Sequence, residues 1–258
     1  MSYEMISVTD VAGIGVITLN RPAVMNALSR QLRLEMLAAI KALEVSARVL
    51  VFTGAGRAFC SGQDLADAQA LGPVDFEAVL HEEYEPLLNA IYACRVPTIA
   101  AVNGAAAGAG ANLALAADVV IAAESASFIQ AFTRIGLIPD AGGTYWLPRQ
   151  IGFARAMGAA LFADKISARQ AADWGMIFEC VPDDSFAAHV QARAAHLANG
   201  PTAAYRGVKT ALRASFGNDL QGQLALEARL QGQMGQTEDF REGVAAFLEK
   251  RPARFTGR

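Results

Sequence analysis

Short apolar runs alternate with glycine-rich breaks over the first two thirds of the chain, which predicts buried strands that each end in a turn. We expect strands at residues 5–8, 14–20, 49–53, 98–102 and 119–122, with extended structure resuming at Ser127-Phe128. Helical spacing of apolar residues predicts a helix that Ser29 caps and that runs to about Ala47, and a second helix over residues 76–93. Residues 66–75 contain Leu71-Gly72-Pro73 and predict a loop.

The last third of the chain has a different pattern, in which alanine-rich helical periods dominate. We expect helices at residues 153–162, 168–174, 186–199, 202–216, 220–234 and 238–250, with one strand at 178–181. Strands first and helices last indicate the α/β class, with an all-helical C-terminal region. The predicted division is an α/β core over residues 1–199 and a helical region over residues 200–258.

A stretch of small residues follows the strand at 98–102. Asn103-Gly104 ends the apolar run, and Gly104, Gly108 and Gly110 are separated by nothing larger than alanine. Glycine permits a close approach of backbones, and a helix that starts here leaves backbone N–H groups unpaired. These features indicate a site for an anion or a developing oxyanion. Tight packing of a helix against the sheet is the alternative.

A second loop of small residues, AFCSGQDL at 58–65, also comes directly after a buried strand. Loops at the same end of parallel strands are where α/β proteins place their sites. The first loop lacks the third glycine of a dinucleotide fingerprint, because that position is Leu113, and it has no Gly-Lys-Ser/Thr phosphate motif. It therefore suits one oxygen atom better than a chain of phosphates.

Composition and charge argue against several classes of partner and indicate a compartment. The 258 residues carry a net charge of −3, which gives no support to a nucleic-acid or membrane-surface partner. The start of the chain does not resemble a signal peptide, and no apolar run is long enough to cross a bilayer. Cys60, Cys94 and Cys180 lack metal or redox spacing, so we expect free thiols, no bound metal and a cytoplasmic protein.

Five segments in order carry a family resemblance: TLNRPAVMNAL, VFTGAGRAFCSGQDL, AVNGAAAGAG, IGLIPDAGGTYWLPR and REGVAAFLEKR. They are similar to the enoyl-CoA hydratase/isomerase (crotonase) superfamily, from about Ile14 to the C-terminus. Within it, LIPDAGGT, RAMGAALFADKISARQAADWGMIFECV and the ending FTGR look most like the ring-1,2-epoxyphenylacetyl-CoA isomerases of bacterial phenylacetate degradation.

The resemblance implies a spiral of β-β-α units with C-terminal helices that build homotrimers, often paired into homohexamers. It implies an acyl-CoA thioester as substrate, with coenzyme A as part of that substrate and no separate cofactor. The backbone N–H groups of Gln63 and Ala109 would form the oxyanion hole, where fixed donors stabilise an enolate oxygen by about 3–4 kcal/mol each.

The same resemblance implies contacts with coenzyme A. Ala23, Val24 and Ala27 match residues at the nucleotide end, and Asp64, Leu65 and Ala66 match residues along adenine and pantetheine. Phe247 and Lys250 match a pair that comes from a neighbouring subunit. An ordinary amphipathic helix explains Phe247 and Lys250 equally well.

The sequence departs from the family at two positions where hydratases have glutamates, which are Asn112 and Phe132 here. Phe132 would then line the substrate site, and Asn112 would orient the substrate or a water. Asp140 matches the acid/base residue of some isomerases, and Leu137, Ile138 and Trp146 should desolvate it and raise its pKa. Asp140 precedes Ala141-Gly142-Gly143, where we expect a helix to start, so it could equally be a helix N-cap.

The predicted function is therefore an isomerase in which Asp140 moves a proton between carbons of an acyl-CoA. Two substrates fit: ring-1,2-epoxyphenylacetyl-CoA, converted to the oxepin form, and a 3-enoyl-CoA, converted to the 2-enoyl-CoA. A hydratase of unsaturated acyl-CoA is the first alternative. A catalytically weak member that binds CoA thioesters, or one that binds RNA, is the second.

Overall fold

The computed structural model describes residues 3–66 and 75–258, so most of the loop predicted at 66–75 lies outside the described residues. Its larger sheet has six strands in the order β1-β2-β3-β5-β7-β10. Only β1 pairs antiparallel; the remaining pairs are parallel. The strands are β1 (Ile6–Val11), β2 (Ile14–Leu19), β3 (Val49–Gly54), β5 (Thr98–Val102), β7 (Val119–Ala123) and β10 (Glu179–Val181).

A smaller sheet of four short strands has the order β4-β6-β8-β9, in which β4, β6 and β8 run parallel. It comprises β4 (Ala58–Cys60), β6 (Ala105–Ala107), β8 (Ser127–Ile129) and β9 (Ile166–Ser167). The sequence predicts only loops at β4 and β6, because runs of three residues, AFC and AAA, are too short to show the alternation of a strand. Each of β3, β5 and β7 feeds a strand of the smaller sheet and then helical structure, which confirms the α/β class and its β-β-α units.

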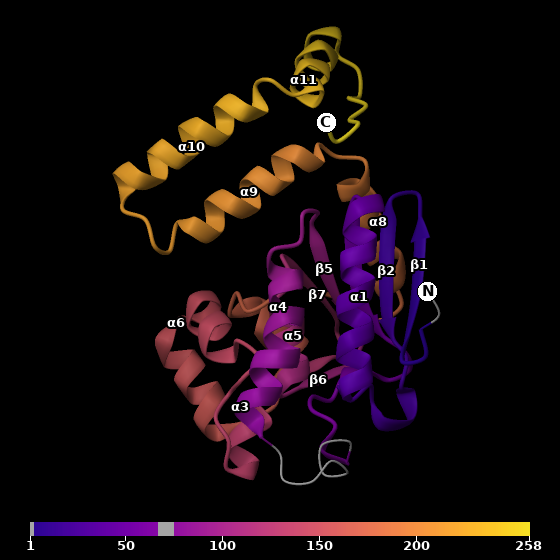
Figure 1. Cartoon of the computed structure of the whole chain (residues 1–258), viewed down its shortest axis with the longest axis vertical. Coiled ribbons are helices and arrows are strands. Elements are labelled where there is room, and N and C mark those ends of the chain that lie inside the picture. Colours follow the sequence, from indigo (N-terminus) through magenta and orange to yellow (C-terminus); the bar gives the residue numbers. More distant parts are fainter. Residues whose placement is uncertain (1–2, 67–74) are drawn as a thin grey trace.

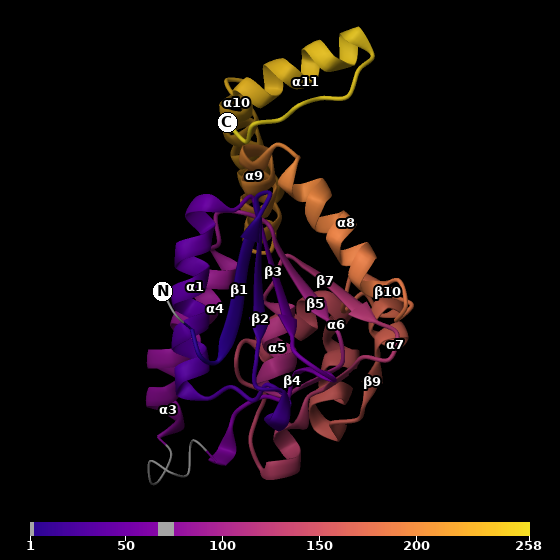
Figure 2. The ribbon, with the colours of Figure 1, turned by 90° about the vertical axis from the view of Figure 1, so that its right-hand side faces the viewer.

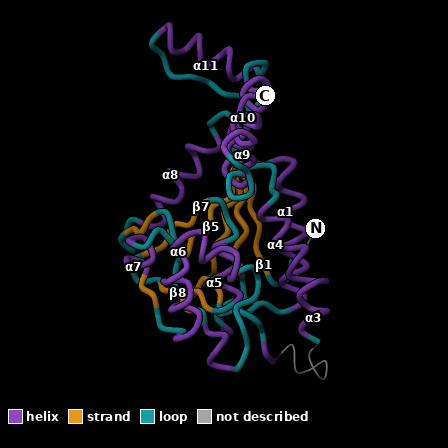
Figure 3. The backbone as a smooth tube through the Cα atoms, turned by 90° about the vertical axis from the view of Figure 1, so that its left-hand side faces the viewer, coloured by secondary structure: helices purple, strands orange, loops and turns teal. Residues whose placement is uncertain are grey.

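Helices cover both faces of the larger sheet. One face packs on α1 (Arg30–Ser46), α4 (Glu85–Tyr92) and α5 (Ala109–Leu115), and the other packs on α8 (Phe186–Ala198). Figures 2 and 3 show the strands enclosed between α1 on one side and α8 on the other. The remaining helical elements of this part are η1 (Pro22–Val24), α3 (Phe76–Val79), η2 (Leu80–Tyr84), η3 (Ala131–Ile135), α6 (Gly143–Phe162) and α7 (Ala168–Asp173).

Two predicted helices differ in detail from the structure. Residues 76–92 form one helical stretch, but η2 within it is a π turn between α3 and α4. The helix predicted from Phe153 is the second half of α6, which begins at Gly143 and kinks at Gly152, where φ is 75° and ψ is 164°. Among the described residues, no helix is long and apolar enough to cross a membrane.

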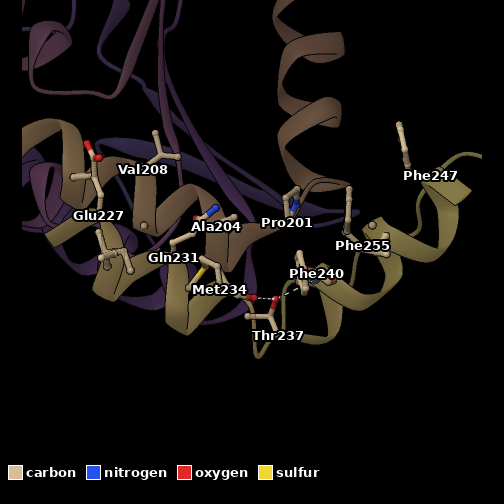
Figure 4. A pocket seen from close by; sticks show the side chains of 18 of the residues that line it. Pro201, Ala204, Val208, Glu227, Gln231, Met234, Thr237, Phe240, Phe247 and Phe255 are labelled. Carbon is tan, nitrogen blue, oxygen red and sulfur yellow. Dashed lines mark hydrogen bonds between the residues drawn. The ribbon is translucent and has the colours of Figure 1, made fainter. Parts of the chain in front are cut away.

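The last three helices, α9 (Thr202–Ala214), α10 (Leu220–Met234) and α11 (Glu238–Glu249), extend away from the sheets as an arm (Figure 1). Ion pairs anchor α9 to the core: Lys209 and Arg213 reach Asp118 at 2.7 and 2.6 Å. The three helices enclose an apolar groove of about 970 Å³, lined by residues such as Val208, Met234 and Phe240 (Figure 4). The boundary predicted at residues 199 and 200 stays a prediction.

Candidate active site

Three loops meet where the parallel strands of the smaller sheet end. Cys60 of β4 pairs with Ala106 of β6, which pairs in turn with Phe128 of β8. Residues 61–64, 108–109 and 130–132 follow directly after these strands, so they lie along one edge of the sheet. The carboxyl ends of parallel strands are the usual position of a site in α/β proteins.

The first two of these loops touch through their backbones, which explains the need for glycine. Gly62 has φ of +96°, and a Cβ atom there would lie 2.8 Å from the carbonyl oxygen of Ala107 and 3.5 Å from the amide nitrogen of Ala109. At Gly110, a Cβ atom would lie only 2.4 Å from the carbonyl oxygen of Cys60. Any larger residue would push the loops apart.

This contact leaves two backbone donors close to each other. Leu28 donates to the carbonyl of Gly62 and accepts from the amide of Asp64, so the peptide N–H of Gln63 between them faces away from Leu28. Ala109 is the first residue of α5, where N–H groups lack partners within the helix. In the described part of the chain, neither N–H group donates a hydrogen bond. Together they could hold one oxygen atom.

Asp140 lies in the turn between η3 and α6. Its carbonyl accepts from the amide of Gly143 and from the Asn112 side chain, both at 2.8 Å. Its carboxyl atom Oδ1 is buried and lacks a hydrogen-bond partner among residues 3–66 and 75–258. The backbone of this residue is therefore fixed, whereas its carboxyl group is left available.

Burial raises the pKa of Asp140 from its ordinary 3.8 to about 6. The predicted direction is confirmed, but one predicted cause is wrong, because Ile138 is 77% exposed and cannot shield the carboxyl group. The N-cap alternative is also wrong for this structure. Gly142 is the N-cap of α6, and no side chain accepts a hydrogen bond there.

Asn112 in α5 and Phe132 in η3 both belong to segments that follow strands of the smaller sheet. Asn112 is fully buried, and its side chain donates to Asp140 and accepts from Gln130 at 2.8 Å. These bonds hold the Asp140 turn; an orienting role toward substrate or water stays a prediction. The Phe132 ring is buried and faces Gly108, where a Cβ atom would lie 3.8 Å from it.

A cavity of about 530 Å³ opens beside Asp140. Tyr84, Tyr92, Tyr145 and Trp146 form one part of its wall, and His81, Glu85 and Asn89 also line it. Tyr145 and Trp146 pack edge to face, with their ring centres 4.8 Å apart. The lining residues that matter for the chemistry are Asp140, Tyr84, Leu88, Tyr92, Tyr145 and Trp146. Such a cavity can enclose a ring or a short chain next to a carboxyl group.

The segments expected to bind coenzyme A lie side by side. Ser61 donates to Met25 and Leu28 donates to Gly62, which aligns residues 25–28 with residues 61–64. Arg21 ties the two segments together through the Asp64 carboxylate at 2.7 Å and the Ala27 carbonyl at 2.6 Å. Ala23 and Val24 in η1, and Leu65 and Ala66, are exposed, whereas Ala27 and Asp64 are buried.

Phe247 and Lys250 do not join this site within one chain. They lie at the end of α11, and that helix is at the opposite end of the molecule from β4 and α3 (Figures 1 and 2). The Phe247 ring is 83% exposed. A contribution to coenzyme A binding would therefore have to be made to another subunit.

Sequence reasoning missed Tyr84, Arg33 and Gln130. Tyr84 and Arg33 both contact the side chain of Gln63, from 21 and 30 residues away. No local pattern links such positions, so only the fold brings them together. Gln130 had a weak signal, since it is a polar residue between two phenylalanines at the end of a predicted strand.

Comparison with known proteins assigns the chain to a family. The family model for enoyl-CoA hydratase/isomerase matches residues 9–258. A "probable enoyl-CoA hydratase" from Rhodobacter capsulatus is 65% identical over the full length of both chains. The "1,2-epoxyphenylacetyl-CoA isomerase" of Escherichia coli is 45% identical over 95% of this chain and 96% of its own.

Solved structures agree with this assignment. A crystal structure of an enoyl-CoA hydratase from Bacillus anthracis superposes with a TM-score of 0.92 at 34% identity, over 99% of this chain and 100% of that chain. The strand order, the two sheets and the helical arm are thus shared with solved proteins of that description.

Proposed function

Because this chain belongs to the enoyl-CoA hydratase/isomerase family, we propose that it is an acyl-CoA isomerase in which Asp140 carries the proton. Family membership makes it an enzyme that acts on acyl-CoA, as a hydratase or an isomerase. One observation carries the finer assignment. At the strand ends, the only carboxyl group left without a partner in the described residues is that of Asp140, and its pKa is raised to about 6.

The proposed reaction needs no co-reactant. The Asp140 carboxylate removes a proton from the α-carbon of the acyl group, and the electron pair moves onto the thioester oxygen. The N–H groups of Gln63 and Ala109 stabilise that enolate oxygen. When Asp140 returns the proton to another carbon, the thioester C=O bond re-forms and the C=C double bond is left at a new position. A carboxyl group with a pKa near neutrality can both accept and return a proton.

Ring-1,2-epoxyphenylacetyl-CoA is the proposed substrate, converted to the oxepin-CoA of phenylacetate catabolism. The ring C–C bond that the epoxide oxygen spans opens to give the seven-membered oxepin ring, and Asp140 moves the α-proton to a ring carbon, so that product and substrate are isomers. The aromatic wall formed by Tyr92, Tyr145 and Trp146 supports it, since these rings can pack against a cyclic acyl group. The 45% identical relative is named for that isomerisation. The same machinery would shift a 3-enoyl-CoA to the 2-enoyl-CoA.

Hydration of an enoyl-CoA is the second candidate, and the comparisons taken alone support it better. The relative with 65% identity carries the name of a probable enoyl-CoA hydratase. The geometry argues the other way, because Asn112 and Phe132 supply no carboxylate to activate water. The Asn112 side chain is moreover already used in hydrogen bonds, because it donates to the Asp140 carbonyl and accepts from the Gln130 amide.

The two candidates predict different products in deuterated water. The isomerase should exchange α-protons of an acyl-CoA for deuterium, as followed by mass spectrometry, while it hydrates crotonyl-CoA poorly. Efficient hydration would overturn the isomerase assignment. Acyl-CoA binding with neither activity would identify a catalytically weak member of the family.

We further propose that coenzyme A lies along the aligned segments, against Ala23, Val24 and Ala27 on one side and Asp64, Leu65 and Ala66 on the other. Phe247 and Lys250 would complete that site from a neighbouring subunit of a homotrimer or homohexamer. Exposure of both residues on α11, far from the sheets, supports this arrangement.

A further inference from the structure

We propose that the side chain of Gln63 is an anchor that positions the oxyanion hole, clamped between Arg33 and Tyr84. The inference rests on the proposed function, which uses the backbone N–H of the same residue. An alanine at this position would supply the same N–H group. Any role specific to glutamine at this position must therefore come from its side chain.

The amide oxygen of Gln63 accepts two hydrogen bonds, one from each of two neighbouring side chains. Arg33 donates through Nη1 at 3.1 Å, and the hydroxyl group of Tyr84 donates a second, shorter bond. Two donors on one acceptor fix the amide plane. With Leu28 paired to both neighbouring peptide groups, the direction of the Gln63 N–H is fixed from the backbone and from the side chain.

Arg33 is itself held rigidly. It is 2% exposed, forms an ion pair with Glu83, and lies over the Tyr84 ring at 4.7 Å from the ring centre. It also donates to the carbonyl of Leu28. One buried guanidinium thus holds both the Gln63 side chain and Leu28, the residue that pairs with the peptide groups on either side of Gln63. Buried charge networks of this kind restrict a site to one geometry when all their members have partners.

Tyr84 links this clamp to the acyl cavity. It is 3% exposed and ends the π turn η2, a type of distortion that is often found at functional sites. Its hydroxyl group bonds to Gln63, whereas its ring lines the cavity beside Asp140. Burial raises the pKa of Tyr84, so the hydroxyl group stays protonated and remains a donor. The oxyanion donor and the cavity wall are therefore connected through one side chain.

The test compares Gln63→Met, which keeps the length of the side chain but removes its acceptor, with Tyr84→Phe, which keeps the ring but removes the donor. The readout is the infrared carbonyl band of bound phenylacetyl-CoA labelled with ¹³C at its thioester carbonyl. In the wild type, the two N–H groups should shift this band to lower frequency. In both variants the band should move back toward its frequency in water, and kcat should fall about tenfold with KM nearly unchanged.

Tyr205→Phe is the matched control, since Tyr205 is a half-buried tyrosine on α9 outside the site. Its band and its kcat should match those of the wild type. If folded Gln63→Met and Tyr84→Phe keep the wild-type band position and the wild-type kcat, the Gln63 side chain does not position the oxyanion hole. The proposed function would then stand unchanged. A wild-type enzyme without any band shift would overturn the oxyanion hole itself. If Gln63→Met fails to fold, Tyr84→Phe decides alone, because its ring still fills the same space.

Discussion

Asp140 combines a fixed backbone with an unpaired carboxyl group, which is the arrangement expected of a proton carrier. The Asn112 side chain and the Gly143 amide hold its carbonyl oxygen, while Oδ1 is buried and lacks a partner in the described chain. A structural carboxylate would be expected to have partners, because leaving a buried polar atom unpaired costs free energy.

Replacing Asp140 by Asn should abolish most turnover without disturbing binding. The amide keeps the volume but cannot accept a proton, and general acid–base catalysis contributes roughly a hundredfold to ten-thousandfold. We expect kcat to fall by about that factor, while coenzyme A thioester affinity in a titration stays at the wild-type value. In the wild type, kcat/KM should rise with pH through about 6, because the base form of Asp140 appears above its pKa.

The same substitution should change the pH dependence of stability. The raised pKa means that the neutral carboxyl group is favoured in the folded state. Its contribution to the free energy of unfolding is therefore complete below pH 3.8 and is lost as pH rises through about 6. Asn carries no charge at any pH. The melting temperature of Asp140→Asn relative to the wild type should therefore increase between pH 4 and pH 7. A constant difference over this range would mean that Asp140 titrates normally.

At this scale, the sequence predicted which residues matter better than it predicted their contacts. The raised pKa of Asp140 followed from apolar neighbours, yet Ile138 points to solvent and Gly142 takes the N-cap position. The cap prediction failed because Ala141 adopts a positive φ of 47°, which shifts the helix start by two residues. The partners of Gln63 come from α1 and η2, so no local pattern could show them.

At the scale of elements, the site depends on the close approach of the two small-residue loops. Both were predicted from glycines that follow buried strands, because a glycine pattern is a local signal. The short strands β4 and β6 within them, and the π turn η2, were not predicted. Their formation depends on pairing and packing with distant segments.

Gly110→Ala should disrupt the close contact between the two small-residue loops. The added Cβ atom would lie 2.4 Å from the Cys60 carbonyl oxygen, and backbone atoms cannot move aside cheaply. Overpacking of this kind costs roughly 1–3 kcal/mol, and the Ala109 N–H would move with the helix start. We expect a lower midpoint of urea unfolding together with a loss of turnover in the folded protein.

Gly158→Ala is the matched control for this change. Gly158 lies inside α6, and a Cβ atom there meets nothing within 4 Å. Alanine in a helix is favoured over glycine by roughly 0.5–1 kcal/mol, so this variant should keep its activity and unfold at equal or higher urea. Equal behaviour of the two variants would remove the argument that close loop contact builds the site.

At the scale of the whole molecule, the arm formed by α9, α10 and α11 exposes more apolar surface than a single chain should. The large apolar side chains exposed on α10 and α11 are Leu220, Leu224, Phe240, Val244, Phe247 and Leu248. Contiguous apolar patches of this kind mark interaction surfaces. Light scattering at micromolar protein should give three or six times the chain mass of 27.2 kDa. A stable monomer would exclude both the oligomer and a shared coenzyme A site.

If neighbouring subunits share each site, two inactive variants should restore activity in mixed oligomers. Asp140→Asn lacks the proton carrier but still offers Lys250, whereas Lys250→Glu keeps Asp140 and repels the phosphates of coenzyme A. Co-expression would place an intact Lys250 beside an intact Asp140 on different chains. We expect turnover at low acyl-CoA well above the sum of the two separate variants. Merely additive turnover would place Lys250 outside the site, since within its own chain α11 lies at the opposite end of the molecule from α3 and β4 (Figures 1 and 2).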